Sequence, residues 1–218
     1  SPAAALAAHI GDSWNELGIE SERLGHDTSP SPNPAAWSSA VAALEALGSL
    51  DIKVPISAIE KGFEQVCWPC RMETLSHSPL LVADGAHNVY SIESLLDSLP
   101  MYFLYDNLIL VVGFSRDKNV EGMAQALGQK ADRIYATASR HPRSLTPSEV
   151  SGLFDEIEQP VFEIATPSRA LKMAVDVAKK GDLILATGSL FLSAEVREVA
   201  LGIEPEIYSE RPTTGFSA

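Results

Sequence analysis

The sequence lacks several features that would place it in familiar classes of protein. It has two cysteines among 218 residues, too few for a disulfide framework, and this favours a reducing compartment. No apolar run approaches the roughly 18 residues that a membrane-spanning helix needs. Residues 1–8 lack the basic start of a secretory signal, and also an initiator methionine. We expect a cytoplasmic protein with no membrane partner; an organelle such as a mitochondrion or plastid is the alternative.

Basic residues are also scarce. Lysine and arginine number 16 against 29 acidic residues, which gives a formal net charge of −13. Binding to a phosphate backbone rests on clustered lysine and arginine, so a nucleic-acid partner is not expected. A small anionic ligand held by a few local groups remains compatible with this charge. Two nucleotide-binding fingerprints are absent as well: no Gly-x-Gly-x-x-Gly follows a predicted strand, and no Gly-x-x-x-x-Gly-Lys-Ser/Thr loop occurs.

The pattern along the chain changes at Leu80, after a connection over residues 67–73. Before it, amphipathic helical pieces over residues 1–25 and a proline-rich linker over 26–36 precede predicted helices at 35–47 and 55–65. After it, short apolar runs alternate with helical patterns, and the tail from Glu204 shows no regular pattern. The runs begin near Leu80, Leu108, Arg133, Val161 and Leu183, and the helical patterns cover about 88–99, 119–131, 146–157, 167–180 and 190–201.

This alternation is typical of strands joined by crossover helices. We therefore predict an α/β fold with a mainly parallel sheet and helices on both faces, preceded by a short helical segment. The predicted boundaries are residues 1–72 for the helical segment with its linker and 73–218 for the α/β domain. In such a sheet the polar turns that follow the strands share one edge, where ligands usually bind.

The most informative turn is Asp84-Gly85-Ala86-His87-Asn88, directly after the first predicted strand. Asp84 could accept hydrogen bonds from ribose hydroxyls, and Gly85 would let the backbone approach a ligand. His87 and Asn88 begin a predicted helix, where N–H groups and the helix dipole favour phosphate. Read without its context, Asp-Gly is an ordinary turn and a single histidine is more often solvated or packed.

Other turns at this edge can likewise be interpreted either as ligand-binding or as purely structural. Thr187-Gly188-Ser189 could hold a carboxylate or phosphate, or could simply cap the last predicted helix. Arg140-His141-Pro142-Arg143 is interpreted as a solvated basic turn, with direct catalysis as the alternative. Phe114-Ser115-Arg116-Asp117-Lys118 adds further charges after the second predicted strand. Together these turns make one predicted binding site at the carboxyl edge of the sheet.

The two cysteines form the pair Cys67-x-x-Cys70, which raises a redox alternative. A thioredoxin-like pair lies where a helix lowers the pKa of one thiol. Here the pair follows a predicted helix instead. A zinc site would need four ligands, and His77 and His87 complete the set poorly.

Five motifs in order give the chain a family resemblance. They are Trp68-Pro69-Cys70-Arg71-Met72-Glu73, the Asp84 turn, Gly113-Phe114-Ser115-Arg116-Asp117-Lys118, His141-Pro142-Arg143 and Thr187-Gly188-Ser189-Leu190-Phe191. This series resembles the folylpolyglutamate synthase/dihydrofolate synthase family of the Mur ligase superfamily. Asp-Gly-Ala-His-Asn favours the folate branch. The resemblance implies a Rossmann-like C-terminal domain, in agreement with the pattern of strands and helices.

The resemblance also implies a reaction. The family joins L-glutamate to a folate or dihydropteroate, after ATP has converted the carboxyl group to an acyl phosphate. Arg71 and His87 would be the catalytic residues, with Arg71, Asp84, His87 and Asn88 binding ATP. Ser189 is a weaker candidate for holding glutamate. The implied cofactors are ATP and Mg2+, and the implied partners are these small molecules, with the protein a monomer.

The chain departs from the family in ways that matter. The family's P-loop and Mg2+ ligands lie in a larger N-terminal ATPase domain, and none can be placed here. Cys70 stands where the family usually has glycine, beside the phosphate-binding Arg71. The sequence is therefore interpreted as the C-terminal portion of such a ligase, inactive alone; the alternative is a non-catalytic nucleotide- or folate-binding module derived from one. Because Asp84 and His87 lie in a loop, alanine at either position is expected to abolish ligation with little loss of folding.

Overall fold

The computed structural model describes residues 34–65 and 68–205. The chain divides into two units, Ser1–Thr74 and Leu75–Ala218. The predicted helical pieces at 1–25, nearly all of the predicted linker at 26–36, Cys67 and the end of the tail lie outside the described residues.

The described part of the first unit contains two helices. Helix α2 spans Pro34–Ser49 and helix α3 spans Ile56–Gln65, close to the predicted bounds. A proline suits the first position of α2, because its missing N–H would have no helical partner there. The helix ends where Asp51 turns into the left-handed region, with φ of 58°, and the amide of Ile52 donates back to the carbonyl of Leu47 at 3.0 Å.

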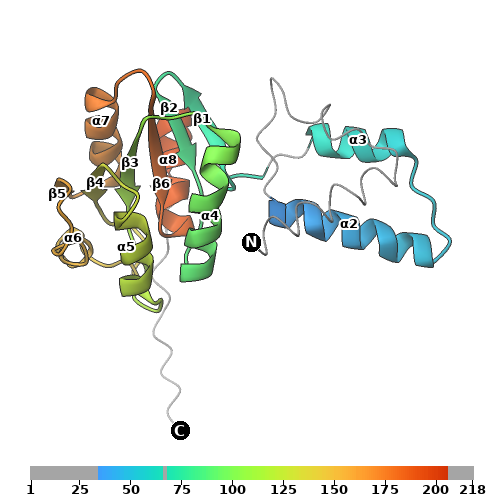
Figure 1. The fold of residues 1–218 in the computed structure, drawn as a ribbon, viewed down its shortest axis with the longest axis horizontal. Coiled ribbons are helices and arrows are strands. Elements are labelled where there is room, and N and C mark those ends of the chain that lie inside the picture. The colour runs from blue at the N-terminus through green and yellow to red at the C-terminus, as the bar shows by residue number, and fades with distance from the viewer. Residues whose placement is uncertain (1–33, 66–67, 206–218) are drawn as a thin grey trace, which may run out of the picture. The chain divides into compact units, whose positions relative to one another are not determined.

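The second unit is built on a six-stranded sheet with the order β1-β2-β6-β3-β4-β5. Strands β2 to β6 pair in parallel, as predicted, and β6 lies between β2 and β3. Figure 1 shows the strands side by side, with β5 at one margin and β1 at the other. The strands are β1 Glu73–His77, β2 Leu80–Ala83, β3 Asn107–Val112, β4 Arg133–Ala136, β5 Val161–Glu163 and β6 Asp182–Thr187.

The sequence interpretation missed strand β1. Its residues, Glu-Thr-Leu-Ser-His, include a single apolar side chain, so no apolar run announces the strand. Only Ser78 and Pro79 separate β1 from its sheet neighbour β2, and a connection this short joins antiparallel strands. The sheet is therefore mixed rather than wholly parallel.

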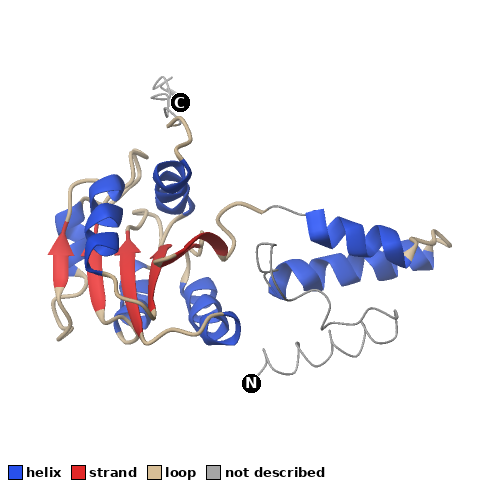
Figure 2. Ribbon diagram, turned by 90° about the horizontal axis from the view of Figure 1, so that it is seen from above, coloured by secondary structure: helices blue, strands red, loops and turns tan. Residues whose placement is uncertain are grey.

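Helices cover both faces of the sheet, as predicted (Figure 2). Helices α4 and α5 pack against each other on one face, and α7 and α8 pack together on the other (Figure 1). The helices of this unit are α4 Val89–Tyr102, α5 Val120–Gly128, α6 Pro147–Gly152, α7 Pro167–Val177 and α8 Leu190–Leu201.

The core lies on both sides of the central strands. Toward α7 and α8, alternate strand residues join the apolar faces of these helices; the cluster contains Leu81, Ala83, Ile109, Val111, Tyr135, Ile164, Ala170, Leu171, Ala174, Ile184, Ala186 and Val196. The intervening residues Val82, Leu110 and Leu185 are fully buried too, as are Ile92 of α4 and Met123 of α5. Burial on both faces explains why these strands appear as continuous apolar runs.

Helix α6 is shorter than predicted. It ends at Gly152, although the pattern had indicated a helix through residue 157. Beyond it the chain continues in tighter turns, in which the amides of Leu153 and Phe154 donate to the carbonyls three residues earlier. Such turns eclipse side chains and do not propagate far. Phe154 is nevertheless fully buried, which is why the apolar pattern continues past the helix.

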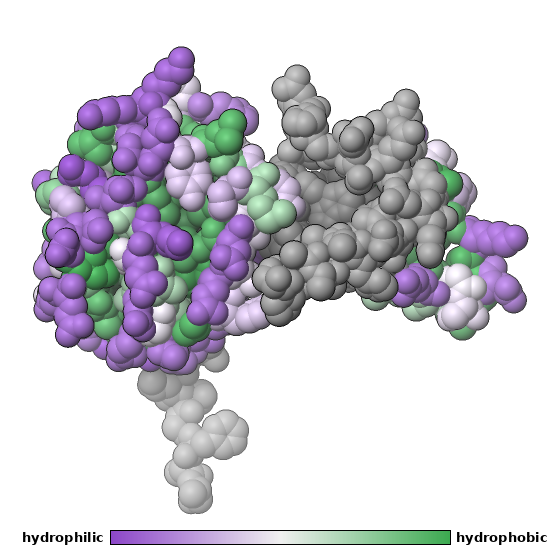
Figure 3. Space-filling model, viewed as in Figure 1, coloured by the Kyte–Doolittle hydropathy of each residue, from purple (hydrophilic) through white to green (hydrophobic). Residues whose placement is uncertain are grey.

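The visible surface of this unit is mainly hydrophilic, with smaller apolar patches between charged side chains (Figure 3). Within residues 34–65 and 68–205, no helix combines the length and apolarity required to cross a bilayer.

Candidate functional site

The predicted site lies at the carboxyl edge of the sheet, where hydrogen bonds continue beyond the strands. The amide of Asp84 donates to the carbonyl of Ala186 at 3.0 Å, and the amide of Gly113 donates to the carbonyl of Thr187 at 3.4 Å. The turns that follow β2, β3 and β6 are therefore neighbours, as the parallel sheet predicted.

Asp84 is held rigidly at the start of its turn. Its exposed fraction is 4%, and its Oδ1 accepts a hydrogen bond of 2.8 Å from the amide of Ala86. This local Asx turn shapes the loop around Gly85. The sequence interpretation placed Asp84 in a loop outside the core, but its side chain is buried and satisfies a backbone donor. We therefore expect alanine at this position to lower the stability of the protein.

The next residues begin helix α4. Asn88 is the N-cap, and its Oδ1 accepts from the amide of Ser91 at 2.8 Å, while Ser91 Oγ accepts from the amide of Asn88 at 3.1 Å. The amide of His87 donates to the same Ser91 hydroxyl at 3.1 Å. Two of the amides that a phosphate could have used are thus partnered by Ser91. Asn88 has a structural role that the sequence interpretation did not assign.

His87 is half-buried, and its ring is oriented by the turn. Its Nδ1 lies 2.9 Å from the carbonyl oxygen of Gly85. A proton on Nδ1 satisfies this contact and leaves Nε2 as the nitrogen that is not engaged by Gly85. In the doubly protonated ring, Nε2–H is a donor suited to an anionic oxygen.

The turn after β6 approaches β3 closely. Gly188 has φ of 99°, and a β-carbon there would lie 2.8 Å from the carbonyl oxygen of Gly113 and 2.9 Å from the ring of Phe114. Ser189 is the N-cap of α8, and its Oγ accepts from the amide of Leu192 at 3.1 Å. Ser189 is 3% exposed, so its hydroxyl serves the helix first. The capping alternative for this turn is thereby confirmed.

One residue that joins these two turns escaped the sequence interpretation. Ser193, in the first part of α8, is fully buried, and its Oγ lies 2.7 Å from the carbonyl oxygen of Asp84. The same hydroxyl lies 3.1 Å from the carbonyl of Ser189 and 3.2 Å from that of Ala186. The available signal was a serine within an otherwise apolar helical run.

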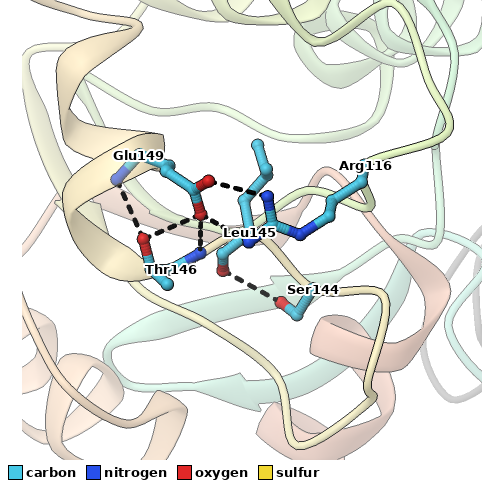
Figure 4. Close-up of polar contacts among 5 residues, drawn as sticks. All are labelled: Arg116, Ser144, Leu145, Thr146 and Glu149. Atoms are coloured by element: carbon cyan, nitrogen blue, oxygen red, sulfur yellow. Dashed lines mark hydrogen bonds and ion pairs between the residues drawn. The ribbon is translucent and has the colours of Figure 1, made fainter.

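The turns after β3 and β4 form a second connected group, shown in Figure 4. Arg116 Nη1 and Nη2 each donate to one carboxylate oxygen of Glu149 at 2.7 Å. Glu149 also accepts from the amide and hydroxyl of Thr146, at 2.7 and 2.8 Å, and so caps α6. The side-chain hydrogen bond from Arg116, followed by those from Thr146, lowers the pKa of Glu149 to about 2.

These charges pair with one another. The amide of Arg116 donates to the carbonyl of Arg143 at 2.9 Å, and Arg143 Nη1 donates to Asp117 at 3.1 Å. His141 and Phe191 stack with ring centroids 3.8 Å apart, and Arg143 lies 5.8 Å from the Phe191 ring. The basic turn is thus tied to the β3 turn and to α8, rather than simply solvated.

A buried carboxylate anchors the β4 turn to α8. Glu195, 3% exposed, accepts a hydrogen bond from the amide of Arg140. The Arg140 guanidinium reaches Glu198 on the same helix. Burial raises the pKa of Glu195, against the lowering effect of the Arg140 amide and guanidinium. The buried carboxylate thus satisfies a backbone donor of the turn.

Arg71 lies in the first unit, and the backbone around it is unusual. Cys70 and Met72 have φ of 56° and 46°, and the amide of Cys70 donates to Glu73 Oε2 at 2.9 Å. Arg71 is half-buried between these two buried neighbours. The left-handed conformation of Cys70 gives a physical reason for the glycine that the resemblance places there. The redox alternative stays untested, since Cys67 is outside the described residues.

Among the residues that the structure describes, no group of three or more histidine, cysteine, aspartate or glutamate side chains could hold a metal ion. The carboxyl edge offers carbonyls, amides, the oriented imidazoles of His87 and His141, and paired charges. Such groups can bind and orient a polar ligand.

Comparisons with known proteins agree on one family. The model of the Mur ligase, glutamate ligase domain matches residues 70–190. A probable bifunctional folylpolyglutamate synthase/dihydropteroate synthase of Halobacterium salinarum is 29% identical over 194 residues, which cover 88% of this chain and 22% of that protein. The dihydrofolate synthase/folylpolyglutamate synthase of Escherichia coli is 29% identical over 176 residues, 78% of this chain and 38% of that protein.

A solved structure gives the same result. Escherichia coli FolC in complex with DHPP and ADP matches with a TM-score of 0.67 and 27% identity, over 80% of this chain and 40% of that one. The α/β fold is therefore shown independently of the sequence motifs. The chain spans less than half the length of each of these relatives.

Proposed function

The chain belongs to the family of the Mur ligase glutamate ligase domain, and from this premise we propose that it forms part of an ATP-dependent ligase that adds L-glutamate to a folate or dihydropteroate. The observation that carries the proposal is the joining of the Asp84 turn to the Thr187-Gly188-Ser189 turn through Ser193. Two family motifs, remote in sequence, thereby form one edge of a site. The relatives from Halobacterium salinarum and Escherichia coli, which carry the name folylpolyglutamate synthase, support the choice of substrate.

The reaction has two steps in this proposal. The substrate carboxylate attacks the γ-phosphorus of ATP, which gives an acyl phosphate and releases ADP. The amine of glutamate then attacks the acyl carbon, forms the amide and releases phosphate. Neither step changes the oxidation state of any group, so no redox partner is required.

The residues take the following roles. Asp84 accepts from the ribose hydroxyls, as a carboxylate oxygen can. His87, oriented by Gly85, donates Nε2–H to a phosphate oxygen. Arg71 stabilises negative charge during phosphoryl transfer. Asn88 contributes mainly by capping α4, and Ser189 orders the turn that receives glutamate.

Mg2+ does not fit the described part of this chain, which holds no cluster of suitable ligands. We assign no step to a metal here; in this proposal any metal ligands lie in another domain. The sequence also has no Gly-x-x-x-x-Gly-Lys-Ser/Thr loop. The 218-residue chain alone is therefore expected to bind ATP weakly and not to turn it over.

The test is a glutamate-ligation assay on the complete product of the gene that encodes this chain, with a folate monoglutamate and dihydropteroate as separate substrates. Asp84→Asn is preferred to alanine, because it keeps Oδ1 as an acceptor for the amide of Ala86 while removing the charge. His87→Gln removes the imidazole. Each variant is expected to lower kcat/KM by about 100-fold or more if it removes an interaction made with the reacting phosphates or the ribose.

A matched control separates binding from folding. Asn119 caps α5 with its Oδ1, 3.1 Å from the amide of Gly122, as Asn88 caps α4. Asn119→Ala should cost about 1 kcal/mol of stability, as a lost N-cap does, and leave ligation unchanged. Unchanged glutamate addition in Asp84→Asn and His87→Gln would refute the residue roles. A wild-type protein that binds ATP and folate but ligates nothing would instead favour the non-catalytic binding module.

A further inference from the structure

We propose that Ser193 is a positioning residue that couples the Asp84 turn to the Ser189 turn, so that the nucleotide and glutamate subsites form together. The inference rests on the proposed function and goes beyond it, because Ser193 belongs to none of the motifs that carry the family resemblance. It touches no ligand in this scheme and acts through the backbone of its two neighbours.

The hydrogen-bond geometry assigns the direction of the contact. The Ser193 hydroxyl has one proton and lies near three carbonyl oxygens, of which that of Asp84 is closest, at 2.7 Å. The carbonyls of Ala186 and Ser189 already accept backbone amides, from Asp84 at 3.0 Å and from Ser193 itself at 3.1 Å. The hydroxyl therefore donates chiefly to Asp84.

The result is a closed arrangement around Asp84. Its amide is held by β6, its carbonyl by α8, and its Oδ1 by the amide of Ala86. The carboxylate cannot be re-aimed without breaking one of these bonds. Because Ser193 is one helical turn after Ser189, any shift of the α8 N-terminus is transmitted to the carbonyl of Asp84.

Packing alone does not explain a serine here. Ser193 is fully buried, as are Leu192 and Val196 on the same helix. An alanine would fill nearly the same volume without a polar atom to satisfy. A buried acceptor that loses its donor carries a desolvation cost, so the hydroxyl is tied to the carbonyls that it serves.

The experiment compares Ser193→Ala with wild type in the complete gene product. Ser193→Ala should raise KM for ATP and KM for glutamate together, each roughly fivefold to thirtyfold, as expected for one buried hydrogen bond. The value of kcat should stay within about threefold, because Ser193 contacts no reacting atom. Dissociation constants for ADP and for glutamate, measured by calorimetry, should rise by the same factors as the KM values.

Ser98→Ala is the matched control. Ser98 Oγ donates to the carbonyl of Ser94, four residues earlier in α4, at 2.7 Å. This contact matches that of Ser193 with Ser189 within α8, without a counterpart of the bond to Asp84. It should leave both KM values unchanged. Ser193→Thr keeps the hydroxyl and should recover most of the affinity. If Ser193→Ala does not fold, Ser193→Cys, which keeps a weak donor, replaces it, and its KM values should lie between those expected for alanine and wild type.

A double-mutant cycle completes the test. If Ser193 acts through Asp84, then Ser193→Ala added to Asp84→Asn should weaken ADP binding by less than it does in the wild-type background. Unchanged KM values in Ser193→Ala, a rise for only one substrate, or fully additive effects in the cycle would overturn the inference. A wild-type protein that binds both ligands without ligating them would refute the proposed function, and the two dissociation constants would still decide the role of Ser193.

Discussion

Arg116 and Glu149, 33 positions apart, meet through two parallel hydrogen bonds of 2.7 Å each. The carboxylate also closes the capping box of α6 through Thr146. The side chain of Glu149 thus connects the turn after β3 to the N-terminus of α6, the helix that follows β4. Bidentate geometry of this kind is stronger than a simple surface ion pair.

This pair predicts a specific dependence of stability on pH. The pKa of Glu149 is about 2, below its ordinary value of 4.5, so the ionised form is favoured by folding. Its contribution is complete above about pH 4.5 and is lost as the pH falls toward 2. We expect Glu149→Gln to lower the thermal midpoint at pH 7, and the difference from wild type to close as the pH approaches 2.

The measurement is thermal denaturation followed by far-ultraviolet circular dichroism between pH 2 and 7. Asp176→Asn is the control, since Asp176 pairs with Lys172 on the exposed side of α7 and makes no cap. That substitution should change the midpoint little at any pH. A difference for Glu149→Gln that persists at pH 2 would contradict the assignment of its cause.

Gly188 gives the second prediction. A β-carbon at this position would lie 2.8 Å from a backbone oxygen of Gly113, in addition to the strain of φ at 99°. Gly188→Ala should therefore destabilise the protein by about 2 kcal/mol or more. Gly202→Ala is the matched control. Gly202 also has a positive φ, of 64°, but a β-carbon there would have no heavy atom within 4 Å. It should cost only about 1 kcal/mol, and equal costs in urea denaturation would disprove the steric argument.

Cys70 gives the third prediction. Its φ of 56° lies in the left-handed region, which disfavours residues with a β-carbon by about 1–2 kcal/mol. Cys70→Gly should be more stable than Cys70→Ala, which removes the same thiol but keeps the strain. All three tryptophans lie within residues 1–74, so indole fluorescence during urea denaturation reports on the unit that contains Cys70. An alanine variant as stable as the glycine variant would argue against strain.

Much of the fold could be predicted because local sequence patterns indicate most of its strands and helices. The strands from Leu80 to Thr187 appear in the sequence as apolar runs. The starts of helices α6 and α7 are marked by the N-caps Thr146 and Thr166, each followed by a proline. Strand β1 gave no such signal, since it is held by the hairpin with β2 and contributes one apolar side chain.

The closeness of the polar turns could be predicted, but the side-chain contacts between them could not. Residue types placed Asp84, His87 and Ser189 at the same edge, because parallel strands bring their carboxyl ends together. The pairing of Asp117 with Arg143, or of Ser193 with Asp84, depends on the tertiary arrangement of segments up to 109 positions apart. No local pattern encodes such partners, and a serine within a helix is usually unremarkable.

The order of the strands has a consequence for how the domain is assembled. Strand β6 is the last of the strands that the structure describes, yet it lies between β2 and β3 and is buried along its whole length. During synthesis from the N-terminus, the β1–β2 hairpin and the β3–β4–β5 sheet have no strand to join them until residue 187 has left the ribosome. The apolar margin of β2, which ends at Ala83, therefore has no partner strand until β6, which ends at Thr187, has been synthesised. Completing the sheet requires pairings of high sequence separation, such as that of β2 with β6, which makes folding slow relative to that of a domain assembled from neighbouring segments.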